Sequence, residues 1–246
     1  MKSRYLPVCA CLLAFGPALA AENRCPRQPV TFSIEGLAGS DEESFKSAFQ
    51  AARAKVCAWL GPDFAGPLTV NVEDSRGPSM ALLPAWRGQH GTMLFRSDTT
   101  RMGRSAIVHE LVHVYAPNAN RFLAEGLAVH AHEHLGGAAA HPNFGTDIHR
   151  AAKEFAGQAD IPAFDRIAVP ARLELGGLRE QETYIVAGSF VRFLIEAHGL
   201  DRFRRLYAMT PLVPRAKNAG DPARWREIYG RSLEALAAEW KAKIGD

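Results

Sequence analysis

The chain lacks a long apolar run beyond its first twenty residues, and it has only four cysteines and no cluster of basic residues. A membrane-spanning helix needs about 20 consecutive apolar residues, and no later stretch reaches that length. No basic run or interleaving of basic and aromatic residues is long enough to suggest nucleic acid, so we expect no nucleic-acid partner. What remains is a composition that is 47% hydrophobic and 22% charged, which is ordinary for a globular protein.

The first twenty residues have the pattern of a secretory signal peptide. Two basic residues precede an apolar run over residues 5–15, and Ala18 and Ala20 supply the small residues that a signal peptidase reads. The alternative is an N-terminal membrane anchor, for which the run is short. Cleavage after residue 20 brings the formal net charge from +3 to +1, because two basic residues leave. We therefore expect a periplasmic or secreted protein with no stable membrane insertion after cleavage.

Two cysteines, Cys25 and Cys57, remain after that cleavage. An even pair in an oxidising compartment favours a disulfide, which here would join the N-terminal segment to the end of the first predicted helix. The alternative is two free thiols, since spacing alone does not show that two cysteines are close.

The hydrophobic periodicity predicts an α+β fold in a single zincin-like domain over residues 21–246. Strands are predicted at residues 30–34, 67–72 and 92–95. Helices are predicted at residues 40–60, 101–115, 121–135, 147–156, 182–197, 200–208 and 232–244. Ser40 and Glu43 form a capping-box pattern at the first of these helices. Residues 21–98 thus form a small α/β part with a sheet and a helix, and residues 99–246 a mostly helical part.

A His-Glu-Leu-Val-His motif at residues 109–113 lies within the helix predicted for residues 101–115. Residues four apart share a helix face, so His109 and His113 can reach one metal ion. Glu110 is rotated off that face, toward a water held by the metal. Zinc suits this pattern because it accepts nitrogen and oxygen ligands and keeps one position open in catalytic sites. The alternative is a pair of structural histidines bonded to the backbone.

A third metal ligand is expected on the next helix, predicted for residues 121–135. Glu125 is the sole acidic residue in the strongly apolar start of that helix, so its carboxylate needs a partner. Gly126 and its small neighbours predict a close approach to the helix that carries the histidines. The alternative partner of Glu125 is Arg121, one turn earlier.

The His-Glu-x-x-His helix, followed by a Glu-Gly-x-Ala sequence from Glu125, resembles the gluzincin group of zinc peptidases, most closely its small secreted bacterial members. The resemblance covers roughly residues 90–245, and Phe122 stands where an aromatic residue is expected. It implies that two histidines and a downstream glutamate bind zinc. It also implies that the strand before the motif helix, residues 92–95, forms the edge along which an extended peptide pairs.

The chain departs from two better-known patterns. Ala116 and Ala119 stand where metzincins have glycine and histidine, which excludes that class. Val129 stands where the thermolysin type has an aspartate, and eleven residues separate His113 from Glu125, fewer than in that type. These departures leave the subfamily and its substrate preference open.

A zinc peptidase also needs a donor for the oxyanion that develops on the scissile carbonyl. By the resemblance, Tyr184 takes this role, and the alternative is a tyrosine packed at the start of a helix. Further candidates for the same role are His141, His149 and His198.

A second group of histidines, His130, His132 and His134, lies near the end of the predicted 121–135 helix. His130 and His134 are spaced to share a face, so a second metal site is one interpretation. The other is a solvated, histidine-rich helix end, where imidazolium is favoured by the helix dipole.

Together these patterns predict zinc-dependent hydrolysis of peptide bonds outside the cytoplasm, with a peptide or protein as substrate. Zn²⁺ is held by His109, His113 and Glu125, while Glu110 activates water and passes the proton to the leaving amine. One alternative is an exported zinc-binding or scaffold protein that keeps a peptidase-like fold without turnover. Another is a metal-dependent hydrolase that acts on a non-peptide bond.

Overall fold

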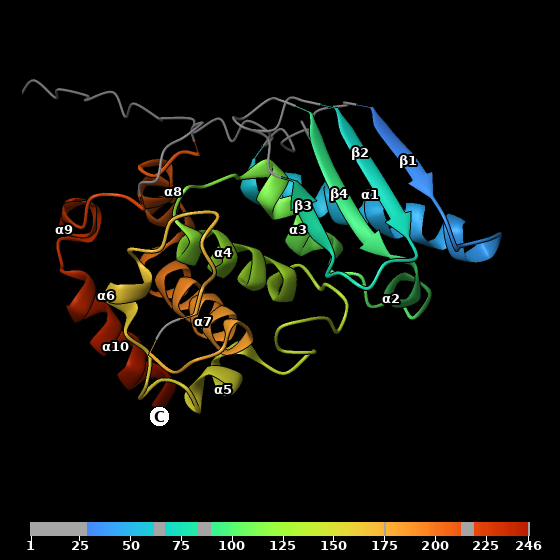
Figure 1. Cartoon of the computed structure of the whole chain (residues 1–246). Helices are drawn as coiled ribbons and strands as arrows, with labels where there is room; N and C mark the ends of the chain where they lie inside the picture. The colour runs from blue at the N-terminus through green and yellow to red at the C-terminus, as the bar shows by residue number, and fades with distance from the viewer. Residues whose placement is uncertain (1–28, 62–66, 83–89, 175, 213–218, 246) are drawn as a thin grey trace, which may run out of the picture.

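The computed structural model describes residues 29–61, 67–82, 90–174, 176–212 and 219–245. Within these residues a small sheet with one long helix forms the N-terminal region, and the C-terminal part is helical (Figure 1). This arrangement confirms the predicted α+β class. The predicted signal peptide and Cys25 lie outside the described residues, so nothing here tests them.

The sheet has four described strands in the order β1-β2-β4-β3. Their bounds are β1 Val30–Ile34, β2 Leu68–Glu73, β3 Met80–Leu82 and β4 Gly91–Arg96. The first two neighbouring pairs are parallel, and β3 is antiparallel to β4. The three predicted strands are confirmed, whereas β3 was not predicted. Because β3 adds to the outer side of β4, the prediction that residues 92–95 form the sheet edge is wrong; β3 is the edge beside the motif helix.

The described helices follow the predicted pattern with three additions and one helix that is shorter than predicted. Their bounds are α1 Ser40–Leu60, α2 Ser97–Arg101, α3 Ile107–Tyr115, α4 Arg121–His134, α5 Ile148–Lys153, α6 Ile161–Phe164, α7 Glu180–His198, α8 Leu200–Ala208, α9 Ala223–Tyr229 and α10 Leu233–Gly245. The helices α2, α6 and α9 were not predicted. None of the helices in the described part is long and apolar enough to cross a membrane.

The helix predicted over residues 101–115 begins later, as α3 at Ile107, and the separate helix α2 precedes it and ends at Arg101. Gly103 has a left-handed φ of 65° and its N–H donates to the Thr100 carbonyl, while the N–H of Arg104 donates to that of Thr99. This pair of bonds is a Schellman motif, which ends a helix at a glycine. The motif helix is therefore short, and its first residue lies only two positions before His109.

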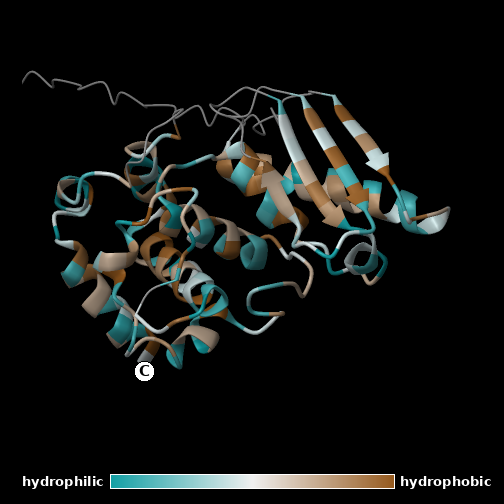
Figure 2. Cartoon of the chain, in the orientation of Figure 1, coloured by the Kyte–Doolittle hydropathy of each residue, from teal (hydrophilic) through white to brown (hydrophobic). Residues whose placement is uncertain are grey.

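One face of the sheet packs against α1 through an aromatic cluster. Phe45 and Phe49 of α1 contact Phe32 of β1, and Phe45 also lies edge-on to Phe95 of β4 at 5.5 Å. The alternation of buried and half-buried residues along β2 and β4 appears as bands of contrasting hydropathy in Figure 2. The capping box predicted at Ser40 is not formed, because Gly39 occupies the N-cap and no side chain caps the helix.

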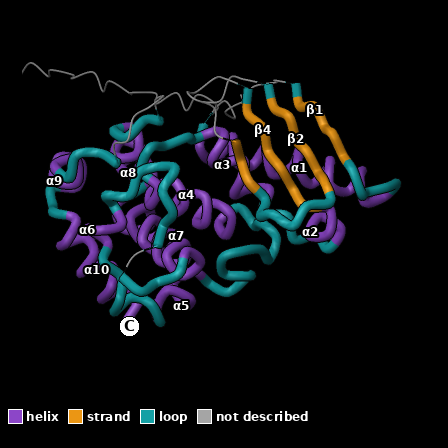
Figure 3. The backbone as a smooth tube through the Cα atoms, in the orientation of Figure 1, coloured by secondary structure: helices purple, strands orange, loops and turns teal. Residues whose placement is uncertain are grey.

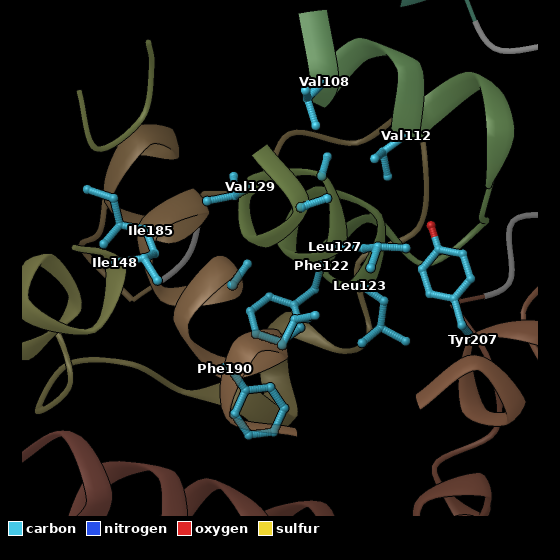
Figure 4. Packing of buried hydrophobic residues seen from close by; sticks show 14 of the residues in the cluster. Val108, Val112, Phe122, Leu123, Leu127, Val129, Ile148, Ile185, Phe190 and Tyr207 are labelled. Carbon is cyan, nitrogen blue, oxygen red and sulfur yellow. The ribbon is translucent and has the colours of Figure 1, made fainter. Parts of the chain in front are cut away.

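The helical part is built around α4 and α7, which lie side by side at its centre (Figure 3). A Cβ on Gly126 would lie 2.6 Å from the Ala187 carbonyl, and one on Gly188 would lie 2.4 Å from Val129. Gly126 therefore allows close packing on α7, and the prediction that it faces the motif helix is wrong. Helix α3 instead meets α4 through apolar side chains, among them Val112 and Leu127 (Figure 4).

Candidate metal centre

Helix α3 places both histidines of the motif on one side. It is buried nearly all round, as its apolar sequence predicts, and His109 and His113 are 8% and 9% exposed. Their Nε2 atoms lie 3.1 Å apart, and the two rings meet edge to face. Two imidazole nitrogens thus face the same point, as the four-residue spacing predicts.

Glu125 completes this group from the second turn of α4. It is 2% exposed, and its Oε2 atom lies 3.2 Å from the Nε2 atoms of both His109 and His113. Its other oxygen, Oε1, lies 3.0 Å from the guanidinium of Arg121. One carboxylate oxygen of Glu125 thus faces the two imidazoles, and the other pairs with Arg121, the alternative partner. These three residues form a buried group that can bind a metal ion.

The charge state of Glu125 fits this role. Burial acts to raise the pKa of the Glu125 carboxyl, but the neighbouring imidazoles of His113 and His109 outweigh it and hold the pKa well below its usual range. The carboxylate is therefore ionised at neutral pH, as a metal ligand must be.

A buried polar network fixes the start of α4 and thereby the position of Glu125. Asn120 is the N-cap and accepts a hydrogen bond from the N–H of Leu123. Its amide donates to the Asp165 carboxylate, which is also held by Arg224 at 2.5 Å and by the indole N–H of Trp225 at 2.8 Å. Sequence reasoning missed this network, although Asn directly before the predicted helix is a recognisable capping signal.

Glu110 lies beside the metal-binding group without joining it. It is 5% exposed, and burial raises the pKa of its carboxyl to about 7, against the lowering effect of His109. A backbone hydrogen bond from Ala81 on the edge strand β3 also lowers that pKa. The carboxyl thus sits between the motif helix and the sheet edge, with a pKa near neutral.

A cleft of about 710 Å³ opens onto this group. Its walls come from β3, from the segment around α2, from the loop between α4 and α5, and from the start of α7. Tyr184 lines it and lies on the first turns of α7, where its hydroxyl accepts a hydrogen bond of 2.6 Å from Arg121 and donates to Glu180. The structure therefore brings the predicted Tyr184 into the same cleft as the predicted ligands.

The other three candidates for the oxyanion donor lie in different places. His141 lines the cleft and contacts the ring of Tyr184 edge-on at 5.7 Å. His149 is bonded to Ser189 through Nδ1, and His198 packs against Tyr229. Neither of these two is among the cleft residues, so only His141 and Tyr184 stay as candidates.

The second group of histidines is divided between two environments. The ring of His132 bonds to the Ala138 carbonyl at 2.7 Å, toward the α4–α5 loop. His130 and His134 both contact the indole of Trp59, at ring distances of 5.7 and 5.4 Å. Within the described ranges, only His109, His113 and Glu125 form a group of three possible metal ligands. The second metal site is thus not supported by the described residues.

Cys57, one of the two predicted disulfide partners, is buried near the end of α1 and is disulfide-bonded.

Comparison of the chain with protein-family models, with curated proteins and with solved structures gives no match.

Proposed function

We propose that the chain is a zinc-dependent peptidase in which His109, His113 and Glu125 hold the ion and Glu110 is the general base. The observation that carries the proposal is the triangle of two Nε2 atoms and one carboxylate oxygen, with edges of 3.1–3.2 Å, beside a separate buried carboxyl. A triad alone is compatible with metal storage, but an adjacent buried base favours hydrolysis.

Zinc fits the three ligands in distance and in chemistry. Zinc bonds of about 2.0–2.2 Å in a tetrahedral site require ligand atoms roughly 3.3–3.6 Å apart, close to the edges of this triangle. Two imidazoles exclude the all-oxygen shells that calcium and magnesium prefer. Glu125 Oε2 is buried with no hydrogen bond of good geometry, although it lies 3.2 Å from both nitrogens, so it is an acceptor that lacks a partner.

The chain's own residues supply the proton transfers. When bound, zinc would act as a Lewis acid and lower the pKa of water to about 7. Glu110, with a pKa of about 7, would accept the proton of the attacking water and later donate it to the leaving amine. Tyr184 is the candidate donor to the oxyanion, and in this role its hydroxyl must turn from Glu180 toward the cleft.

The sheet edge supports a peptide as the substrate. Residues 78–81, which lead into and form most of β3, line the cleft, and within the described sheet β3 has only β4 as a neighbour. An extended peptide can add to such an edge through main-chain hydrogen bonds. A place of action outside the cytoplasm is supported by the disulfide bond at Cys57, since disulfides persist in oxidising compartments.

The substitution Glu110→Gln tests the proposal. It removes the base and keeps the shape of the side chain, so the zinc content should stay near one ion per chain while peptide hydrolysis falls by roughly 10²–10⁴-fold. Zinc is measured by mass spectrometry of the purified protein, and cleavage is measured on a peptide library with and without a chelator. Glu154→Gln, which changes an exposed glutamate away from the cleft, is the matched control.

Three outcomes would decide against the proposal. Undiminished hydrolysis in Glu110→Gln would show that Glu110 is not the general base. Stoichiometric zinc with no cleavage across the library would favour the zinc-binding or scaffold alternative, and chelator-sensitive hydrolysis of other bonds alone would favour a hydrolase of a different class.

A further inference from the structure

Exposed apolar side chains gather around the cleft that holds the metal-binding group. Among the described residues, the large hydrophobic side chains that are exposed are Met80, Leu82, Met102, Phe144 and Met209. Three of them, Met80, Met102 and Phe144, line this one cleft. Single exposed apolar residues are normal on a protein surface, whereas a group of them around one site indicates a place where an apolar ligand binds.

The exposed side chain and the backbone conformation of Phe144 both destabilise the folded state. Its side chain is 60% exposed, and its φ of 47° lies in the left-handed region that non-glycine residues rarely adopt. Gly145, the next residue, is also left-handed, with a φ of 82°. Both the exposed ring and the unfavourable backbone cost free energy in the folded state, and such local strain is concentrated at functional sites.

The loop that carries Phe144 is tied to the helical part. The N–H of Phe144 donates to the Ala140 carbonyl at 2.8 Å, and the Gln181 amide of α7 donates to the Pro142 carbonyl at 2.9 Å. The ring of His141 lies edge-on to Phe144, at a ring distance of 6.2 Å. These contacts hold the Phe144 ring at the rim of the cleft instead of leaving it free to fold back.

The other two apolar side chains lie on the opposite wall. Met80 begins the edge strand β3, and Met102 is the C-cap of α2, so both belong to the sheet side, while Phe144 belongs to the α4–α5 loop. Glu110 and the metal-binding group line the same cleft. A side chain next to the reacting bond of a substrate in this cleft would therefore lie among apolar atoms from both sides.

We propose that Phe144, together with Met80 and Met102, makes this cleft select peptides with a large apolar side chain next to the bond that is cut. The proposal rests on the proposed function for the identity of the substrate as a peptide. Methionine side chains adapt to ligands of different shape, and a fixed aromatic ring gives contact area at a low entropic cost. The cleft is thus suited to phenylalanine, leucine and similar side chains, without a narrow fit to one of them.

Binding of four short peptides tests the inference separately from catalysis. The zinc-loaded Glu110→Gln protein is titrated calorimetrically with Ac-Ala-Ala-Xaa-Ala-Ala-Ala-amide, where Xaa is Phe, Leu, Ala or Glu. The Phe and Leu peptides should bind at least about 10-fold more tightly than the Ala peptide, as loss of apolar contact in a pocket predicts. Adding Phe144→Ala should reduce that ratio to about 2-fold, and Met102→Ala should reduce it in part.

Met209→Ala is the matched control, because Met209 is the exposed methionine outside the cleft, and it should leave the ratio unchanged. Equal binding of all four peptides, a preference for the Glu peptide, no binding at all, or a ratio that survives Phe144→Ala would each overturn the inference. Selective binding without cleavage by the unmodified protein would overturn the proposed peptidase function and leave the inference standing.

Discussion

Two pairs of histidines with the same four-residue spacing lie on consecutive helices and have different surroundings. His109 and His113 of α3 are both buried and face Glu125. His130 and His134 of α4 have a ring separation of 5.5 Å, but their neighbour is the indole of Trp59. Both pairs thus have the spacing that puts two imidazoles on one helix face, but the pair on α3 faces a carboxylate and the pair on α4 an indole.

The difference shows what a four-residue spacing does and does not determine. It brings two imidazole rings side by side on one face of a helix, which both pairs achieve. A metal site needs in addition an ionised acceptor that is aimed at both rings and fixed there. For the pair on α3 that acceptor is Glu125 of α4, which Arg121 orients through its other oxygen; the pair on α4 contacts an apolar ring instead.

The largest effect is expected when one histidine of each pair is removed. His113→Ala should abolish stoichiometric metal binding, a loss greater than the roughly 10–100-fold that partners of metal ligands contribute. His134→Ala should leave the metal content unchanged, because its ring contacts Trp59. Metal content after dialysis against zinc measures both. Equal loss in the two variants would remove the distinction between the pairs.

A smaller effect is expected from the residue that orients the carboxylate. Arg121→Met keeps the unbranched apolar stem of the side chain and removes its ion pair with Glu125, so zinc affinity should fall by roughly 10–100-fold. Competition with a chromophoric chelator measures the dissociation constant. Arg172→Met, at an exposed arginine paired with Glu174, is the control. An unchanged affinity in Arg121→Met would show that the carboxylate needs no orienting partner.

The smallest effect concerns proton binding by the second pair. Burial lowers the pKa of His130 to about 3, with the charges of His134 and Arg192 adding to it. In the unfolded chain the histidine pKa is near 6.5, so between pH 6.5 and about 3 the unfolded state binds a proton that the folded state does not. This group therefore makes the free energy of unfolding fall as the pH decreases below 6.5. The slope is at most about 1.4 kcal/mol per pH unit.

His130→Gln should therefore flatten the pH dependence of the free energy of unfolding between pH 7.5 and 5. Urea denaturation of the metal-free protein at several pH values measures it, with the exposed His90→Gln as the control. If the curves of the variant and the unmodified protein stay parallel, His130 is not the buried neutral histidine that the structure describes.

The central part of the candidate site could be predicted because its signals are local. The helix period places His109 and His113 together, and Glu125 is conspicuous as a single acid in an apolar helix. Glu110 follows from the same helix geometry. In the structure the three predicted ligands converge and Glu110 lines the same cleft, while their roles in metal binding and catalysis stay predictions.

The features that were missed depend on contacts between distant segments. Asp165 and Arg224 are 59 residues apart, so no periodicity relates them to the cap of α4. Strand β3 is three residues long, and its sequence, Met-Ala-Leu, shows no alternation of apolar and polar residues. The position of Gly126 indicates a close approach, but the partner, Ala187 of α7, is fixed only by the packing of the whole helical part. Local patterns predict faces, and tertiary packing selects the neighbours.

The three candidate metal ligands lie close together along the chain, which has a consequence for the order of assembly. An ion held by residues 109, 113 and 125 would close a loop of only about a dozen residues, which saves little chain entropy. The apolar contact between α3 and α4 already brings those residues together. The ion would therefore bind to ligands that the folded chain has already positioned. Removal of the ion should leave a folded protein that can bind zinc again.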